Sequence, residues 1–176
     1  MKIEIVLCGV GGQGLISTGE IIGEAASLYE NKKAVLTSAY GAEARGTFAK
    51  SDIILSDREI SFPNVVVPDI ILCLAQVAYN VYVGEFTDDT IIYYDEDYVV
   101  PDLSAKGKHR GFPFHKISVE QGSALVSNTV ALGVMIGQTG ILKRESVVDT
   151  IERRFCGKPN IIKMNVEALD SGLALI

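Results

Sequence analysis

The stretch CGVGGQG (residues 8–14) follows directly on the apolar run of residues 3–7. A short β-branched run that ends in glycines predicts a buried parallel strand that turns sharply into a helix. The glycines at positions 9, 11 and 14 spell G-x-G-x-x-G. Glycines let the backbone approach a ligand closely, and the free N–H groups of the following helix can then bind an anion. The stretch therefore predicts an α/β fold with an anion site at its first turn.

A dinucleotide site needs more than this glycine pattern. It also requires an acidic residue about 20 residues further on, at the end of the second strand, to bind the ribose. The second predicted strand runs into Leu36-Thr37-Ser38-Ala39-Tyr40, and the first acid beyond it is Glu43. The Gly-Lys-Ser/Thr of a Walker loop is also absent. A purely structural tight turn stays open as the alternative.

The rest of the chain alternates between strand and helix patterns. Further strands are expected at residues 33–37, 48–56, 68–74, 90–94 and 114–117, and helices at residues 14–30, 76–83, 127–140, 144–155 and 160–175. Gly133 and Gly137, about one helical turn apart, would let another backbone approach the helix at 127–140. No linker or repeat interrupts the pattern. We expect one α/β domain over residues 1–176, with a mostly parallel, open, Rossmann-like sheet flanked by helices.

Charge and hydropathy exclude several classes of partner. The net charge is −6, which argues against a nucleic-acid binder. The basic cluster at residues 106–110 is expected to be a solvated loop. No apolar run approaches the ~20 residues that span a bilayer, and no signal peptide is recognisable. We expect a cytoplasmic protein that binds no membrane.

The three cysteines do not form a metal-binding pattern. Cys8, Cys73 and Cys156 are far apart, and the chain has no C-x-x-C. The thiolate spacing of an iron–sulfur site is therefore missing, and only two histidines could support a zinc site. We expect no metal and three buried, reduced cysteines.

A second unusual stretch, SAYGAEARGTFAKSDIILS, spans residues 38–56. Tyr40-Gly41 and Arg45-Gly46 look like tight points around Glu43 and Arg45. An arginine suits a carboxylate or a phosphate. The loop is expected beside the glycine loop, at the carboxyl ends of the strands, where open α/β sheets bind ligands. A contact between Glu43 and Arg45 that merely closes the loop is the alternative.

Together these stretches resemble the gamma subunit, or gamma domain, of the 2-oxoacid:ferredoxin oxidoreductases. The resemblance covers nearly the whole chain. Its residues are those of the glycine loop at 9–14, the stretches at 38–46, 53–56 and 68–70, the helix start at 128–133, and Asn165, Ala168 and Gly172. One departure is Thr47, which follows Gly46 where the family commonly has a second glycine.

The resemblance implies one subunit of an enzyme that oxidatively decarboxylates a 2-oxoacid, transfers the acyl group to coenzyme A and reduces ferredoxin. The 2-oxoglutarate type is the nearest branch. Thiamine diphosphate and iron–sulfur clusters are then expected in the alpha, beta and delta partners rather than in this chain. The chain alone is expected to be inactive and to have no catalytic residue of its own. In isolation it can form a homodimer through surfaces meant for partners, and the helix at 127–140 is the candidate surface if it is exposed.

The resemblance also implies a coenzyme A or partner contact for two loops and one helix start. The implied residues are Gly11, Gly12, Gln13, Gly14, Tyr40, Gly41, Glu43, Arg45, Gly46 and Asn128. Three readings stay open beside it: a free-standing dinucleotide-binding module, an interaction subunit without ligand contacts, and the same complex acting on pyruvate, branched-chain 2-oxoacids or indolepyruvate.

Overall fold

The computed structural model describes residues 1–40 and 47–176. Their strands are β1 (Lys2–Val10), β2 (Lys33–Tyr40), β3 (Phe48–Ser56), β4 (Ile70–Cys73), β5 (Ile91–Asp95) and β6 (Lys108–Phe112). Their helices are α1 (Leu15–Glu24), α2 (Gln76–Tyr82), α3 (Phe114–Glu120), α4 (Ser127–Thr139), α5 (Arg144–Arg154) and α6 (Pro159–Leu173). A π-helical turn (Ala25–Tyr29) extends α1, and a 3₁₀ turn (Ala124–Val126) precedes α4.

The six strands form one open sheet in the order β2-β3-β1-β4-β5-β6. Strands β1, β4, β5 and β6 are parallel neighbours. Strand β3 is antiparallel to both β1 and β2, so β2 again runs in the direction of β1. The prediction of a mostly parallel α/β sheet is confirmed, because only β3 runs against the other strands.

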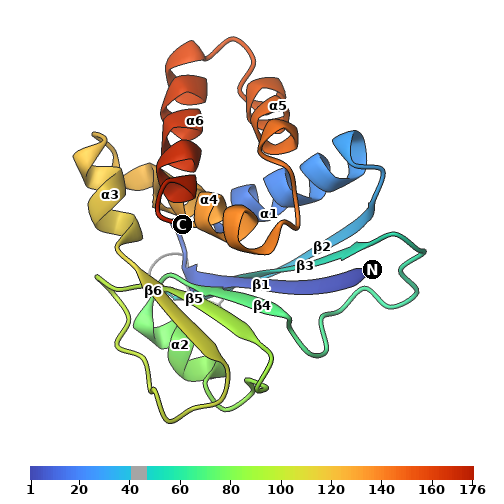
Figure 1. Ribbon diagram of the computed structural model, residues 1–176, viewed down its shortest axis with the longest axis vertical. Coiled ribbons are helices and arrows are strands. Elements are labelled where there is room, and N and C mark those ends of the chain that lie inside the picture. Colours follow the sequence, from blue (N-terminus) through green and yellow to red (C-terminus); the bar gives the residue numbers. More distant parts are fainter. Residues whose placement is uncertain (41–46) are drawn as a thin grey trace.

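Helices cover the two faces of this sheet unequally. Figure 1 shows α1, α4, α5 and α6 together on one face and α2 on the other. The larger core lies under the helical layer and includes Ile5 and Leu7 of β1. The alternate β1 residues Val6 and Cys8 point to the smaller core under α2. This alternation is what a strand buried on both faces requires.

Helices α4 and α6 touch backbone to backbone. A Cβ at Gly133 would lie 2.2 Å from the carbonyl oxygen of Leu169, and a Cβ at Gly172 would lie 2.0 Å from that of Val130. The predicted close approach at Gly133 is therefore confirmed. At Gly137 the nearest atoms belong instead to the side chains of Ile176 and Leu173.

Two predictions at the β6 edge are wrong. Residues 114–117, expected as a strand, are the start of α3. The sixth strand is formed instead by the basic cluster, whose residues from Lys108 to Arg110 were expected in a solvated loop. The four residues Phe114-His115-Lys116-Ile117 are too short a stretch to distinguish a strand from a helix. Strand β6 forms by pairing with β5. Within β6, Nε2 of His109 lies 2.9 Å from the hydroxyl oxygen of Tyr79 in α2.

Two expectations concern exposure. Helix α4 was a candidate surface for self-association on the condition that it is exposed, and this condition is not met, because its residues from Asn128 to Ile136 are all buried. Cys156 was expected to be buried, but it follows the end of α5 and is exposed. Cys8 and Cys73 are buried as predicted, on facing positions of β1 and β4 with their Sγ atoms 3.4 Å apart.

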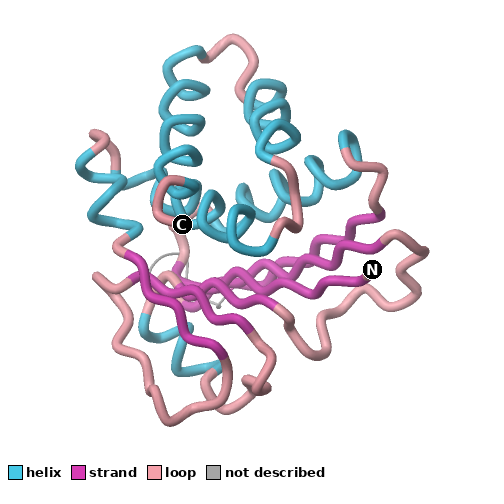
Figure 2. Tube along the Cα trace, viewed as in Figure 1, coloured by secondary structure: helices cyan, strands magenta, loops and turns pink. Residues whose placement is uncertain are grey.

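The loop of residues 57–69 is fastened to the first strand, at the end of the sheet where β1 begins (Figure 2). The carboxylate of Glu4 accepts hydrogen bonds from the N–H groups of Val66 at 2.7 Å and Val67 at 3.1 Å. Burial by itself raises the pKa of Glu4, but these bonds and the one from Lys2 outweigh it and leave the pKa below its ordinary value. Glu4 therefore anchors the loop of residues 57–69 to β1.

We predict that Gly133→Ala destabilises the fold. The added methyl group would overlap the Leu169 carbonyl, and such overpacking costs about 1–3 kcal/mol. This loss would appear although alanine favours a helix over glycine. Urea unfolding measures it. Gly84→Ala, with no atom within 4 Å of the new Cβ, is the control. Equal midpoints for Gly133→Ala and wild type would contradict the close contact.

We predict that the stabilising effect of Glu4 is lost in acid. Its folded-state pKa is lowered, so its contribution is present above the unfolded-state pKa of about 4.3 and disappears as the pH falls through the folded-state value. At pH 7, Glu4→Gln should unfold at a lower urea concentration than wild type. This gap should narrow as both proteins are unfolded at progressively lower pH. A gap that widens in acid would refute the assignment.

Candidate functional site

The glycine loop joins β1 to α1 at the carboxyl edge of the sheet. Gly12 has φ 96° and Gly14 has φ 72°, both in the left-handed region that side-chain-bearing residues avoid. Gly14 is also the residue that caps the start of α1. A Cβ there would lie 2.4 Å from Nδ2 of Asn128. Position 14 therefore requires glycine for two reasons, the left-handed backbone angle and the lack of space for a Cβ beside Asn128.

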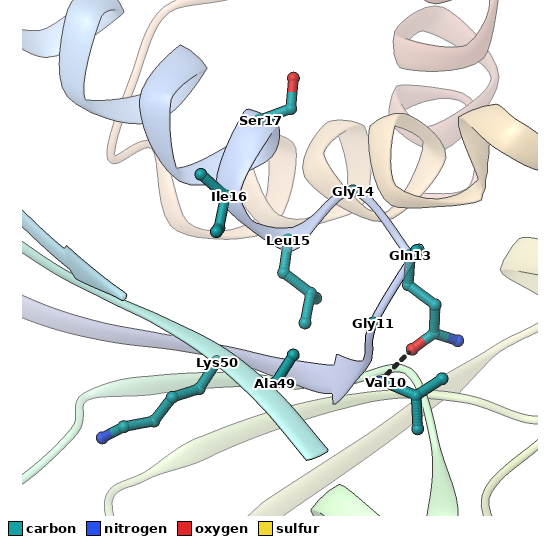
Figure 3. Close-up of a pocket in the computed structure, with 10 residues that line it drawn as sticks. Val10, Gly11, Gln13, Gly14, Leu15, Ile16, Ser17, Ala49 and Lys50 are labelled. Carbon is teal, nitrogen blue, oxygen red and sulfur yellow. Dashed lines mark hydrogen bonds between the residues drawn. The ribbon is translucent and has the colours of Figure 1, made fainter. Parts of the chain in front are cut away.

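A cavity of about 290 Å³ opens over this loop. Residues 10–17 line it from the loop and the first turn of α1, and Ala49 and Lys50 of β3 complete it (Figure 3). Among the described residues, no hydrogen-bond acceptor is found for the N–H groups of Gly12, Leu15, Ile16 and Ser17. Free N–H groups at the start of a helix attract an anion. The start of α1 thus combines a preformed cavity with free N–H groups among the described residues, and the anion site itself stays a prediction.

Gln13 braces the loop instead of pointing a free amide into the cavity. Its Oε1 accepts the N–H of Val10 at 2.8 Å, and its Nε2 donates to the carbonyl of Leu74 at 2.8 Å. The first of these bonds is drawn in Figure 3. The side chain therefore ties the end of β1 to the residue that follows β4. Both halves of the amide are used within the protein.

Asn128 braces the other end of the loop from the first turn of α4. Its Nδ2 donates to the carbonyl of Gly14 at 3.3 Å and to Oγ1 of Thr18 at 2.9 Å. Thr18 donates to the same carbonyl from its N–H at 2.9 Å and from its hydroxyl at 3.0 Å. The Oδ1 atom of Asn128 is buried and has no hydrogen-bond partner among the described residues. One acceptor thus remains unused next to the loop.

Lys50 contributes no cation to the cavity. Ala49 and Lys50 are consecutive in β3 and therefore point to opposite faces of the sheet, as Figure 3 shows. The ammonium group of Lys50 pairs with Asp52 at 2.7 Å on the α2 side. If a bound anion carries several negative charges, residues other than Lys50 have to supply the positive charge at this cavity.

The second predicted loop falls mostly outside the described residues. Gly41, Glu43, Arg45 and Gly46 belong to the gap at 41–46, whereas Tyr40 ends β2. On the other side of the gap, the carbonyl of Thr47 accepts the N–H of Gly11 at 3.1 Å. The described end of this segment therefore adjoins the glycine loop, as the sequence predicts.

The strand order removes the geometry that a dinucleotide site needs. In such a site, the acid at the end of the second strand lies beside the glycine loop of the first. Here β3 lies between β1 and β2. The carboxyl end of β2 is therefore two strand spacings, or roughly 10 Å, from that of β1. The missing acid and this strand order together disfavour the free-standing dinucleotide-binding module.

The described residues contain neither a metal-binding cluster nor a membrane-spanning helix. They contain no group of three or more histidine, cysteine, aspartate or glutamate side chains that could hold a metal ion. No helix within residues 1–40 and 47–176 has the length and apolarity to span a membrane.

We predict that Gln13→Ala lowers the free energy of unfolding by about 1–3 kcal/mol, because the Val10 N–H and the Leu74 carbonyl both lose their partner. Gln13→Glu is the matched variant. It keeps an acceptor for Val10 but sets a carboxylate oxygen against the Leu74 carbonyl, so its urea midpoint should also fall below that of wild type. An alanine variant as stable as wild type would show that Gln13 is not a brace.

Known proteins match this chain over nearly its full length. It is 42% identical over 154 residues to the 2-oxoglutarate synthase subunit KorC of Methanocaldococcus jannaschii, covering 86% of this chain and 82% of the relative. It is 33% identical to the ketoisovalerate oxidoreductase subunit VorA of Methanothermobacter marburgensis, over 97% of this chain but 36% of the larger relative.

A solved structure has the same fold. The gamma subunit of a keto/oxoacid ferredoxin oxidoreductase from Geobacter sulfurreducens matches with a TM-score of 0.87 and 30% identity, over 99% of this chain and 95% of that one. The family described as pyruvate ferredoxin/flavodoxin oxidoreductase matches residues 4–175. Sequence resemblance and fold agree, and this chain belongs to the pyruvate ferredoxin/flavodoxin oxidoreductase family.

Proposed function

We propose that this chain is the gamma subunit of a 2-oxoacid:ferredoxin oxidoreductase of the 2-oxoglutarate type. The complex would convert 2-oxoglutarate and coenzyme A to succinyl-coenzyme A and carbon dioxide, passing two electrons to ferredoxin. Four 2-oxoglutarate synthase subunits are among the relatives, at 30–42% identity. The role of this chain is inferred from the cavity over the glycine loop, whose N–H groups have no acceptor among residues 1–40 and 47–176.

The chemistry of that cavity fits binding better than catalysis. Residues 10–17 offer backbone N–H groups, apolar side chains, one amide and one hydroxyl. No acid, histidine or cysteine lines the cavity among the described residues. Such a site can hold a phosphate group of coenzyme A and orient the cofactor, but it supplies no general acid or base.

Decarboxylation and electron transfer therefore belong to other subunits in this proposal. Thiamine diphosphate and the iron–sulfur clusters would be bound by alpha, beta and delta partners, and ferredoxin would dock on the assembled complex. The chain alone would be inactive. We propose residues 1–176 as one gamma domain of this complex, and the expected cytoplasmic location remains a prediction.

The segment after β2 would complete the coenzyme A site. Tyr40, Gly41, Glu43 and Gly46 are proposed to shape it, and Arg45 to supply positive charge. Lys50 is engaged by Asp52 on the opposite face, so the described lining brings no free cation to the phosphates. A guanidinium binds phosphate oxygens through two parallel hydrogen bonds, which suits Arg45 to this role.

For the identity of the 2-oxoacid substrate there is a second candidate. The match to ketoisovalerate oxidoreductase subunits favours a branched-chain 2-oxoacid as the second candidate. The test is to purify the tagged chain anaerobically from its own host and to identify its companions by mass spectrometry. The same preparation is then assayed with 2-oxoglutarate, pyruvate, 3-methyl-2-oxobutanoate and indolepyruvate. Recovery without a thiamine-diphosphate subunit, or activity confined to another 2-oxoacid, would overturn the proposal.

We predict that Arg45→Ala in the assembled complex raises the KM for coenzyme A by about tenfold or more, because a charge-assisted phosphate contact is lost. The KM for the 2-oxoacid should not change. Steady-state kinetics at saturating 2-oxoacid measure the effect. Arg58→Ala, which removes an exposed arginine, is the control. Equal KM values for coenzyme A in Arg45→Ala and Arg58→Ala would remove Arg45 from the site.

A further inference from the structure

The face of the molecule that carries α2 exposes a group of valines. Val77 and Val81 lie one turn apart on α2 and are 46% and 50% exposed. Val66 and Val67, on the loop that Glu4 fastens, are 68% and 53% exposed. Val100 joins them because its N–H donates to the side chain of Gln76 at 2.7 Å. We call these five valines the α2 face. Val66 and Val81 border the same recess, and adjacent exposed apolar side chains mark interaction surfaces.

A recess of about 300 Å³ opens within the α2 face. Val66 and Val81 line it on two sides, and the carboxyl groups of Asp52 and Glu85 line it with Lys50. Asp52 is 7% exposed. Its Oδ2 accepts the Lys50 ammonium, while its Oδ1 is buried without a hydrogen-bond partner among the described residues. Glu85 is exposed. Two carboxylates and one ammonium leave the recess with one excess negative charge.

The wall of the recess is already in place in the free chain. Glu4 holds the backbone of Val66 and Val67 through two hydrogen bonds. The Tyr82 ring packs against Phe48 with their centroids 6.3 Å apart. A rigid surface loses little conformational entropy when a partner binds, so this face is suited to docking.

The charge of the recess restricts what can cover it. A purely apolar partner would bury Glu85 beside the incompletely bonded Asp52, and uncompensated buried carboxylates are costly. A second copy of this chain would bring the same excess negative charge to the contact. A lysine or arginine instead pairs with the exposed Glu85 through its charged end while its apolar stem packs against the valines.

We propose that another subunit of the oxidoreductase complex docks on the α2 face, through an apolar segment that places one lysine or arginine side chain in the recess. This inference rests on the proposed function, since it takes the partner from the same complex. The contact lies across the sheet from the helical layer and apart from the glycine loop. It would hold the chain in the assembly without covering the coenzyme A cavity.

The test is site-specific photocrosslinking in the complex purified from the host. Benzoylphenylalanine replaces Val81. In a second strain, which serves as the control, it replaces Val119 of α3, which is also 50% exposed. We expect the probe at position 81 to form an adduct with another subunit, in a peptide that carries a lysine or arginine among apolar residues. Glu85→Lys should lower the yield of that adduct on the order of tenfold through charge repulsion. Glu120→Lys, the same change at an exposed site on α3, should leave it unchanged.

The outcomes separate this inference from the proposed function. If the thiamine-diphosphate subunit co-purifies but position 81 forms no adduct, or joins two copies of this chain, the docking proposal is wrong and the proposed function stands. An adduct that Glu85→Lys and Glu120→Lys leave equally intense would also refute it. If no other subunit co-purifies with the wild-type chain, both proposals fail.

Discussion

The arrangement of the site depends on one side-chain amide. Gln13 bonds to Val10 at the end of β1 and to Leu74 just after β4, so it fixes the glycine loop to two neighbouring strands at once. Asn128 fixes the far end of the loop through the Gly14 carbonyl. With both ends held, the N–H groups at the start of α1 keep their positions over the cavity before any anion arrives. Preorganised donors of this kind bind without an ordering cost.

The sheet gives its two faces different roles. One face is sealed by helices, and α4 and α6 approach so closely that only glycine fits at positions 133 and 172. The other face has the seven-residue α2 and a loop fastened by Glu4. That side keeps exposed valines, and one oxygen of Asp52 there has no hydrogen-bond partner among the described residues. The unequal covering fits a chain that works as one part of a larger enzyme.

The accuracy of the sequence predictions followed the strength of the local pattern. Residues 3–8 and 68–74 were predicted as buried strands, and β1 and β4 lie there, because β-branched runs bounded by glycine or proline leave little alternative. Residues 114–117 were placed in a strand but form the start of α3, because four residues with apolar side chains only at Phe114 and Ile117 fit both structures. Lys108, His109 and Arg110 join the sheet only because β5 offers them a partner.

The sequence by itself determined the glycine loop and the α/β alternation, because these depend on residues close together in the chain. It also determined the family, because each of the short stretches that carry the resemblance is read directly from the sequence. Only the tertiary structure decided which residues brace that loop. Gln13 meets Leu74 across 61 positions, and Asn128 meets Gly14 across 114. Tertiary pairing also inserted β3 between β1 and β2, which separates the second strand from the glycine loop. A local pattern encodes a backbone conformation but not a partner, because the partner is chosen by the packing of the whole chain.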